Sequence, residues 1–357
     1  MRFHNLQLLR LAAAVGVVAY HLGVHGAGLS TTLSPTMDWL RSGPWALFPV
    51  PVFFALSGFV LTHALQSAPR GRFLFSRVLR LYPGYWLAIL LGLAIVRYAV
   101  WPPDQAIWAK FSATAFTLAP TGAGKGYYVL GGVEWSLIYE VFLSIALTVL
   151  SFLGVRRGLL VGVSLWLVVL AAKVAFWPRY ASDPFPHWST IALSAYNLPF
   201  LLGVLVYFLR ETGRRWRWPV LAGLAAIAIY ALPEFGGNPE LFWCGWGVVS
   251  AGVVWFAVQV KQVNAANPFA RFGDYTYGLY LVHVPLLLAI YYRSVMRQWD
   301  IAPPQLAALA GTVAVVGGLL FGKLESTLHS RLRPLAKMNW VNVAGQFRLR
   351  LRLTPRY

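Results

Sequence analysis

Long apolar stretches alternate with short polar segments along most of this chain. A helix needs roughly 20 apolar residues to cross the hydrocarbon core of a bilayer. Candidate spans of about this length lie at residues 6–25, 45–66, 77–100, 133–153, 158–177, 190–209, 217–233, 241–259, 274–292 and 304–323. The pattern therefore predicts an all-α, polytopic integral membrane protein with about ten transmembrane helices.

The composition supports the same class. Hydrophobic residues make up 58% of the 357 residues and charged residues only 11%, whereas a typical soluble domain is about 25% charged. The first apolar stretch is too long for the core of a signal peptide, and no small-residue cleavage site follows it. We therefore expect this stretch to remain in the protein as its first helix.

The distribution of basic residues predicts the orientation. With the N-terminus inside the cell, the inner segments carry 22 of the 30 Lys and Arg residues and the outer segments carry 8. Because short cytoplasmic loops are enriched in Lys and Arg, both termini are predicted to be cytoplasmic. The net charge is +19, and the basic residues that cause it lie between apolar spans. The expected partner is therefore membrane lipid and not nucleic acid.

The chain divides into two predicted parts. Residues 1–325 are expected to form a transmembrane domain, and residues 326–357 a basic cytoplasmic tail. The tail ends in FRLRLRLTPRY, an alternation that favours contact with anionic lipid headgroups over a surface strand. The single cysteine, Cys244, excludes an intrachain disulfide and a cysteine-based metal cluster. No metal-ligand spacing is present, so no metal is expected.

Two polar residues share one face of the first span. Arg10 and His21 are eleven residues apart, which places them about 16 Å apart along one side of a helix. Ionisable residues inside a span are costly and often functional. A neutral imidazole can accept a hydroxyl proton near pH 7, so His21 is a candidate general base. The alternative is a hydrogen-bonded packing residue.

A carboxylate is predicted at a similar depth. Counted from the outer surface, Glu140 lies roughly 10 Å deep and His21 roughly 6 Å deep. Glu140 could therefore orient the imidazole, as the carboxylate does in a catalytic triad, or it could pair with an Arg or Tyr. Glu134 and Trp135 are candidates for contacting an acceptor substrate, and Tyr20 could bound the pocket beside His21.

A basic cluster stands at the inner mouth of the 77–100 span. Arg77 and Arg80 are at positions i and i+3, so they share a helical face, and Arg70 and Arg72 precede them. Guanidinium groups suit phosphate binding, with Arg10 as a supporting residue. The alternative is ordinary anchoring by positive residues on the cytoplasmic side.

Two further polar residues carry weaker hypotheses. Ser57 could act as a nucleophile, but the Gly-x-Ser-x-Gly turn that presents such a serine is absent. His283 lies in the middle of its span. We expect it to make a structural hydrogen bond, with a place in the pocket lining as the lesser alternative.

Five stretches, taken in order, resemble the acyltransferase 3 family of integral membrane acyltransferases. They are LQLLRLAAAVGVVAYH, VPVFFALSGFVLTHAL, FLFSRVLRLYPGYWLAIL, VEWSLIYEVFLSIAL and FGDYTYGLYLVHVPLL. The resemblance implies a ten-helix domain that moves an acyl group, usually acetyl, from cytoplasmic acyl-CoA to a hydroxyl of a sugar or glycan. His21 matches the family's essential histidine, and Arg77 and Arg80 match its Arg-x-x-Arg pair, which is associated with the CoA donor. Arg10 and Glu140 match other recurrent polar positions, but the acidic residue that often precedes the arginine is absent here.

The sequence and the resemblance together predict an O-acetyltransferase of the bacterial inner membrane. Its donor would be acetyl-CoA and its acceptor a cell-surface or secreted polysaccharide or a lipid-linked glycan, with His21 as the base. The alternatives are transfer of another acyl group such as succinyl, a small-molecule acceptor, or a glycan or lipid transporter without covalent chemistry. The sequence makes no prediction of the oligomeric state.

Overall fold

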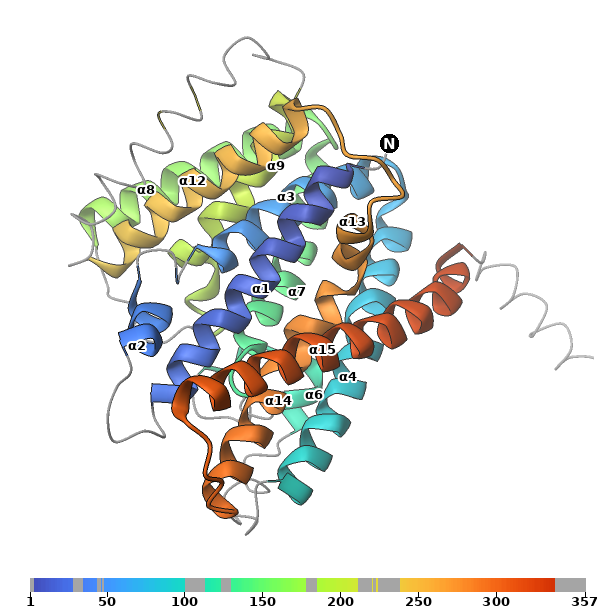
Figure 1. The fold of residues 1–357 in the computed structure, drawn as a ribbon. Coiled ribbons are helices and arrows are strands. Elements are labelled where there is room, and N and C mark those ends of the chain that lie inside the picture. Colours follow the sequence, from blue (N-terminus) through green and yellow to red (C-terminus); the bar gives the residue numbers. More distant parts are fainter. Residues whose placement is uncertain are drawn as a thin grey trace, which may run out of the picture.

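A computed structural model describes residues 3–27, 35–43, 48–99, 113–122, 130–177, 185–210 and 238–337, and the single residues 46, 220 and 223 (Figure 1). Helices and turns make up this part of the chain, in which the only bridge between extended segments joins Thr121 and His187. Eight of its helices are long and apolar enough to cross a membrane. The prediction of an all-α polytopic membrane protein is confirmed.

The helices have the following bounds. The long ones are α1 (His4–Ala27), α3 (Pro49–Gln66), α4 (Arg70–Ala99), α7 (Glu134–Leu150), α8 (Arg157–Phe176), α12 (Pro239–Gln259), α14 (Thr276–Met296) and α15 (Pro303–Leu332). The shorter ones are α2 (Pro35–Ser42), α6 (Ala113–Thr117), α9 (Leu198–Leu209) and α13 (Pro268–Phe272). Short 3₁₀ turns cover Ser151–Leu153, Ile191–Leu193, Ala195–Asn197, Gly273–Tyr275 and Arg333–Lys337.

The predicted span at 190–209 is shorter and more irregular than expected. Its first half forms 3₁₀ turns, and regular α-helix begins only at Leu198, with Pro199 in the first turn. The buried Asn197 side chain donates to the carbonyls of Ile191 and Ala192, at 2.6 and 3.3 Å. A side chain thus satisfies carbonyls that a continuous helix would have paired internally. The predicted span at 217–233 lies outside the described residues, apart from Val220 and Gly223.

Helix α4 begins at Arg70, seven residues before the predicted start, and continues through Pro83. Arg70 donates to the Ser151 carbonyl at 2.7 Å, which fastens the start of α4 to the end of α7. Proline has no N–H, so Pro83 leaves the Leu79 carbonyl without its helical donor. The Nδ1 atom of His329, on α15, lies 3.3 Å from that carbonyl oxygen and replaces the missing donor.

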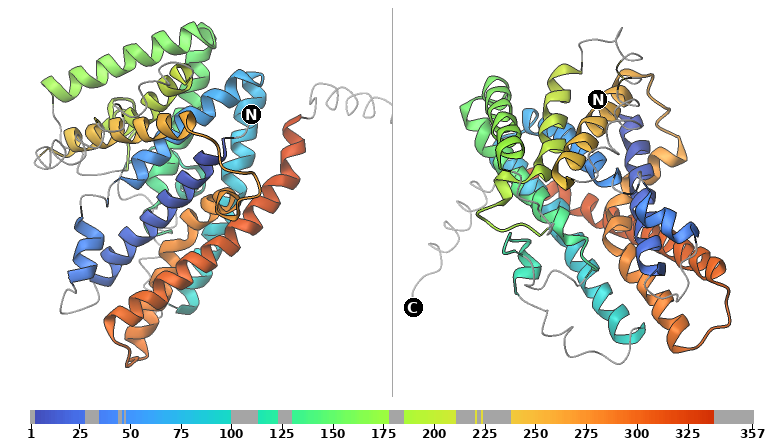
Figure 2. Two further views of the ribbon diagram at one scale, coloured as in Figure 1. Left: turned by 45° about the horizontal axis from the view of Figure 1, so that its top comes forward. Right: turned by 90° about the vertical axis from the view of Figure 1, so that its left-hand side faces the viewer.

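Helix α1 crosses the centre of the bundle. In Figure 1, α3, α9 and α12 lie on one side of it and α4, α14 and α15 on the other. Two pairs of helices pack backbone to backbone through glycines, as is common between membrane helices. A Cβ atom at Gly58 of α3 would lie 2.0 Å from the Phe200 carbonyl oxygen of α9, and one at Gly278 of α14 would lie 2.4 Å from Gly322 of α15. Helices α14 and α15 accordingly run side by side in both views of Figure 2.

One end of the bundle gathers several segments that the charge pattern assigns to the same side. Asn5, at the start of α1, donates to the Lys261 carbonyl and accepts from the Val263 amide, each within about 3.1 Å. His329, near the end of α15, contacts α4 through Leu79. The beginnings of α1 and α4 and the end of α15 therefore share one end (Figure 1), as alternate crossing of a membrane requires. Residues 338–357 of the predicted tail lie outside the described residues, and α15 continues past the predicted boundary at residue 325 to Leu332.

Candidate active site

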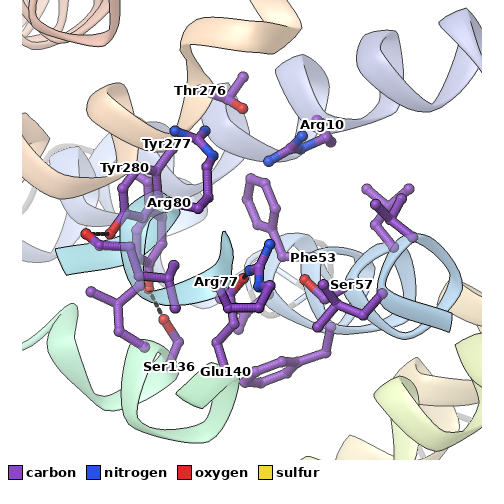
Figure 3. Close-up of a pocket in the computed structure, with 17 residues that line it drawn as sticks. Arg10, Phe53, Ser57, Arg77, Arg80, Ser136, Glu140, Thr276, Tyr277 and Tyr280 are labelled. Atoms are coloured by element: carbon purple, nitrogen blue, oxygen red, sulfur yellow. Dashed lines mark hydrogen bonds and ion pairs between the residues drawn. The ribbon is translucent and has the colours of Figure 1, made fainter. Parts of the chain in front are cut away.

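A cavity of about 240 Å³ lies between α1, α3, α4, α7 and α14 (Figure 3). Its walls combine apolar side chains with a concentrated set of polar ones. The polar residues that matter below are Arg10, Ser57, Arg77, Arg80, Glu140 and Tyr280. In Figure 3 the three guanidinium groups are directed toward one space between the helices. The sequence predicted each of these three arginines as a site residue, and the fold brings them together from two helices.

Two of the arginines are paired with carboxylates. Arg77 forms an ion pair with Glu140 of α7, and Arg80 forms one with Glu325 of α15. The Arg80 guanidinium also lies over the Tyr277 ring, 4.8 Å from its centroid. Glu325 is buried, with 1% of its surface exposed. Glu325 was not among the predicted site residues, although an acidic residue at the end of the last apolar stretch was a signal that could have identified it.

Arg10 differs from the other two arginines. Within the described residues, its guanidinium has no hydrogen-bonding or ion-pairing partner. Arg77 and Arg80 each have an ion-paired carboxylate, whereas Glu140 and Asp274 act on Arg10 only at longer range. A cation in this position, on the wall of a cavity, is available to an anionic ligand.

The structure does not place Glu140 beside His21, and the prediction that Glu140 orients this imidazole is not supported by the geometry. Glu140 contacts Arg77, which was the alternative partner type. The physical reason is charge: a carboxylate inside a bundle gains most from a cation, and Arg77 of the adjacent α4 supplies one. A match in depth alone did not determine which neighbouring helix the Glu140 side chain would contact.

His21 has a different partner, the second mid-span histidine. Its Nδ1 atom lies 3.0 Å from the Val17 carbonyl oxygen and 3.2 Å from Nε2 of His283 on α14. His283 is completely buried, and its Nδ1 atom lies 2.7 Å from the Tyr280 carbonyl oxygen. His283 does make the structural hydrogen bond that the sequence predicted. Its contact with His21 went unpredicted, because no sequence signal links the two spans.

The histidine pair lies next to the cavity without lining it. Tyr280 connects the two: its ring lines the cavity, and the centroid of that ring is 5.8 Å from that of His283. The Tyr280 hydroxyl is 2.6 Å from Ser136 Oγ and donates to the Val133 carbonyl at 3.1 Å. Arg10 and His21 likewise follow each other along α1. The cation site and the imidazole are therefore joined by two helices, α1 and α14.

The three predicted substrate-binding residues have different surroundings. Tyr20 packs edge-on against His21, with 5.0 Å between ring centroids. Trp135 belongs to a cluster of aromatic side chains and does not line the cavity; its neighbours are Phe54, Tyr139, Tyr196 and Trp243.

Glu134, the third of these candidates, is completely buried. One carboxylate oxygen accepts the Leu130 amide at 2.7 Å, and the other has no partner in the described part of the chain. The reason is the turn before α7, where Gly131 and Gly132 have φ values of 78° and 93°. These left-handed conformations, which glycine readily adopts, fold Leu130 back over the carboxylate.

The fold and the site define a polytopic membrane protein with a polar, cation-rich site inside its helix bundle. The family model of acyltransferase 3, described as an acyltransferase domain, matches residues 3–323, which is nearly the whole chain. The chain therefore belongs to the acyltransferase 3 family and is a membrane acyltransferase. No curated protein and no solved structure is significantly similar to it.

Proposed function

We propose that this protein is an O-acetyltransferase of the bacterial inner membrane. It would move an acetyl group from cytoplasmic acetyl-CoA to a hydroxyl of a cell-surface or secreted polysaccharide, or of its lipid-linked precursor. One observation carries the proposal: a cavity lined by three arginines and a hydrogen-bonded imidazole lie in succession along the same two helices, α1 and α14. Transfer of an acyl group from one side of a bundle toward the other requires a donor site followed by a reaction site.

The volume of the cavity and the charge on its wall support an anionic donor that the cavity encloses only in part. Pockets that bury a drug-sized ligand have volumes of about 300–1,000 Å³. A cavity of about 240 Å³ is too small for a whole CoA molecule, so it would enclose only the part of the donor that lies next to the arginines. Arg10 supports binding of a negative group at the cavity wall, because its guanidinium makes no hydrogen bond or ion pair in the described residues.

The chemistry assigned to His21 is general base catalysis. The imidazole would accept the proton of the acceptor hydroxyl while the hydroxyl oxygen bonds to the acyl carbon. The carbon–sulfur bond of the thioester then breaks, and the leaving thiolate takes the proton from the imidazolium. A positioned base of this kind contributes about 10²–10⁴ in rate. Glu140, by contrast, would act on the donor side by holding Arg77.

The experiment is radiolabel transfer from [¹⁴C]acetyl-CoA in membranes that contain the protein, followed by analysis of the labelled glycan. We expect labelled glycan with the wild-type protein and a rate about 10²–10⁴-fold lower with His21→Ala, at equal expression and unchanged thermal unfolding. Succinyl-CoA in a parallel reaction tests the acyl group. Normal acetylation by folded His21→Ala would refute the base assignment. Absence of transfer from either donor, with glycan movement that does not depend on CoA, would refute the enzymatic proposal.

A further inference from the structure

We infer that His283 is a positioning residue for the proposed base: together with the Val17 carbonyl it accepts from the protonated Nδ1 of neutral His21, and it orients the ring so that Nε2 accepts the substrate proton. This inference rests on the proposed function, because it specifies how the base of that reaction is prepared.

The first step concerns the proton on His283. Its Nδ1 atom lies 2.7 Å from the Tyr280 carbonyl oxygen. A carbonyl oxygen can only accept a hydrogen bond, so Nδ1 must carry the hydrogen. No carboxylate hydrogen-bonds to this buried ring in the described residues, so no charge partner favours the doubly protonated form. The neutral ring then has a free electron pair on Nε2, which makes this atom an acceptor.

The position of the hydrogen on the His21 ring is fixed in a similar way. The His21 Nδ1 atom faces two acceptors, the Val17 carbonyl oxygen at 3.0 Å and His283 Nε2 at 3.2 Å. Both require a hydrogen on Nδ1, so the neutral His21 ring has its electron pair on Nε2. Within the described residues, His21 Nε2 has no hydrogen-bond partner, and this atom is not fully buried. The atom that must accept a proton is therefore unblocked.

The second acceptor, His283, relates the His21 ring to other helices. Val17 is on the same helix as His21, so its carbonyl can fix the proton but cannot relate the ring to the rest of the site. His283 is on α14, which is tied to α4 and α7: the Tyr277 hydroxyl donates to the Leu81 carbonyl at 2.8 Å, and the Tyr280 hydroxyl pairs with Ser136. The bond from His283 thus aligns the base with the walls of the cavity. It plays the orienting part that a carboxylate plays in a triad, but with a neutral acceptor.

The kinetic test uses two amides that differ by one methylene group. In His283→Gln, the amide oxygen can take the place of Nε2 and still accept from His21. In His283→Asn, the shorter amide can replace only Nδ1 and leaves His21 without this acceptor. We expect His283→Asn to lower kcat about tenfold, the equivalent of one hydrogen bond, with an unchanged KM for acetyl-CoA. His283→Gln should retain most of the wild-type kcat. Equal losses in the two variants, or a loss that appears only in KM, would overturn the inference.

His63 provides the matched control, since it lies at the other end of the bundle, where its Nδ1 is 3.4 Å from the Tyr207 hydroxyl. His63→Asn should leave kcat unchanged. All variants are compared at equal thermal stability, so that a folding defect is not mistaken for a loss of alignment.

A spectroscopic test does not depend on the reaction. In protein labelled with ¹⁵N-histidine, with resonances assigned by single-histidine substitutions, His21 and His283 should each show a protonated Nδ1 and an unprotonated Nε2 at neutral pH. A protonated Nε2 on His283 would overturn the inference, even in an active enzyme. If the expected tautomers are found in a protein that transfers no acetyl group, the proposed function fails while the hydrogen-bonded arrangement stands.

Discussion

The Arg77 guanidinium of α4 is ion-paired with the Glu140 carboxylate of α7 inside the cavity (Figure 3). The two side chains are 18% and 21% exposed, so the pair is neither fully buried nor free in water. The Nε atom of Arg77 is buried without a partner in the described residues. This guanidinium is therefore only partly satisfied by its carboxylate and retains a donor toward the interior.

Substitution of Glu140 by glutamine should destabilise the protein, because it leaves a partly buried cation without its counter-charge. A hydrogen bond to a charged group contributes about 1.5–3 kcal/mol, and we expect Glu140→Gln to lower the free energy of unfolding by about that amount. Unfolding in detergent, followed by circular dichroism, measures the change. The double variant Arg77→Gln/Glu140→Gln should recover part of the loss. A double variant that is less stable than either single variant would contradict the pairing.

Arg10 should matter more for donor affinity than for stability. Because its guanidinium makes no hydrogen bond or ion pair in the described residues, replacement by glutamine removes a positive charge without leaving an ion-paired carboxylate unpaired. We expect Arg10→Gln to raise the KM for acetyl-CoA about tenfold or more, the equivalent of a lost charge-assisted hydrogen bond, and to leave the unfolding temperature nearly unchanged. Arg72→Gln, at an exposed position of the same basic cluster, is the control and should change KM little. An equal effect of the two substitutions would mean that only the overall positive charge matters.

The class of fold and most of the spans could be predicted from the sequence, because the bilayer imposes a length and an apolar composition on every crossing helix. The prediction failed where polar side chains support irregular backbone. Asn197 satisfies carbonyls of two preceding residues and turns half of a predicted span into 3₁₀ turns. Arg70 is held by the Ser151 carbonyl, so α4 extends beyond its apolar segment.

The site was only partly predictable for a geometric reason. Spacing along one helix fixes depth and face, and this sufficed to predict that Arg10 and His21 share one helix and that Arg77 and Arg80 share a helical face. Contacts between helices also depend on rotation and on the choice of neighbour, which packing decides. Packing places Glu140 against Arg77 and His21 against His283. It also places Glu325, on the last long helix, against Arg80.

Glu325 should be among the most sensitive positions for stability. The residue is 1% exposed. Its carboxylate pairs with Arg80 and has one oxygen without a partner in the described residues. Removing one member of a buried pair typically costs about 3–5 kcal/mol, because the other charge remains buried. We expect Glu325→Gln to lower the free energy of unfolding by about that amount, and Arg80→Met/Glu325→Leu to restore much of it. A loss below about 1 kcal/mol in Glu325→Gln would indicate that water reaches the pair.

Two glycine substitutions test the close packing of α3 against α9. A Cβ atom at Gly58 would lie 2.0 Å from the Phe200 carbonyl oxygen, a contact that only a shift of the backbone could relieve. Overpacking costs about 1–3 kcal/mol or more, so Gly58→Ala should lower the unfolding temperature measurably. Gly71→Ala on α4 is the matched control, since a Cβ atom there meets nothing within 4 Å. Alanine also favours a helix over glycine by up to about 1 kcal/mol, so this variant should be as stable as the wild type or more so.

Because Gly58 follows Ser57 on the cavity wall, a shift of α3 should also raise the KM for the donor. Equal stability of the two variants would contradict the backbone contact between α3 and α9.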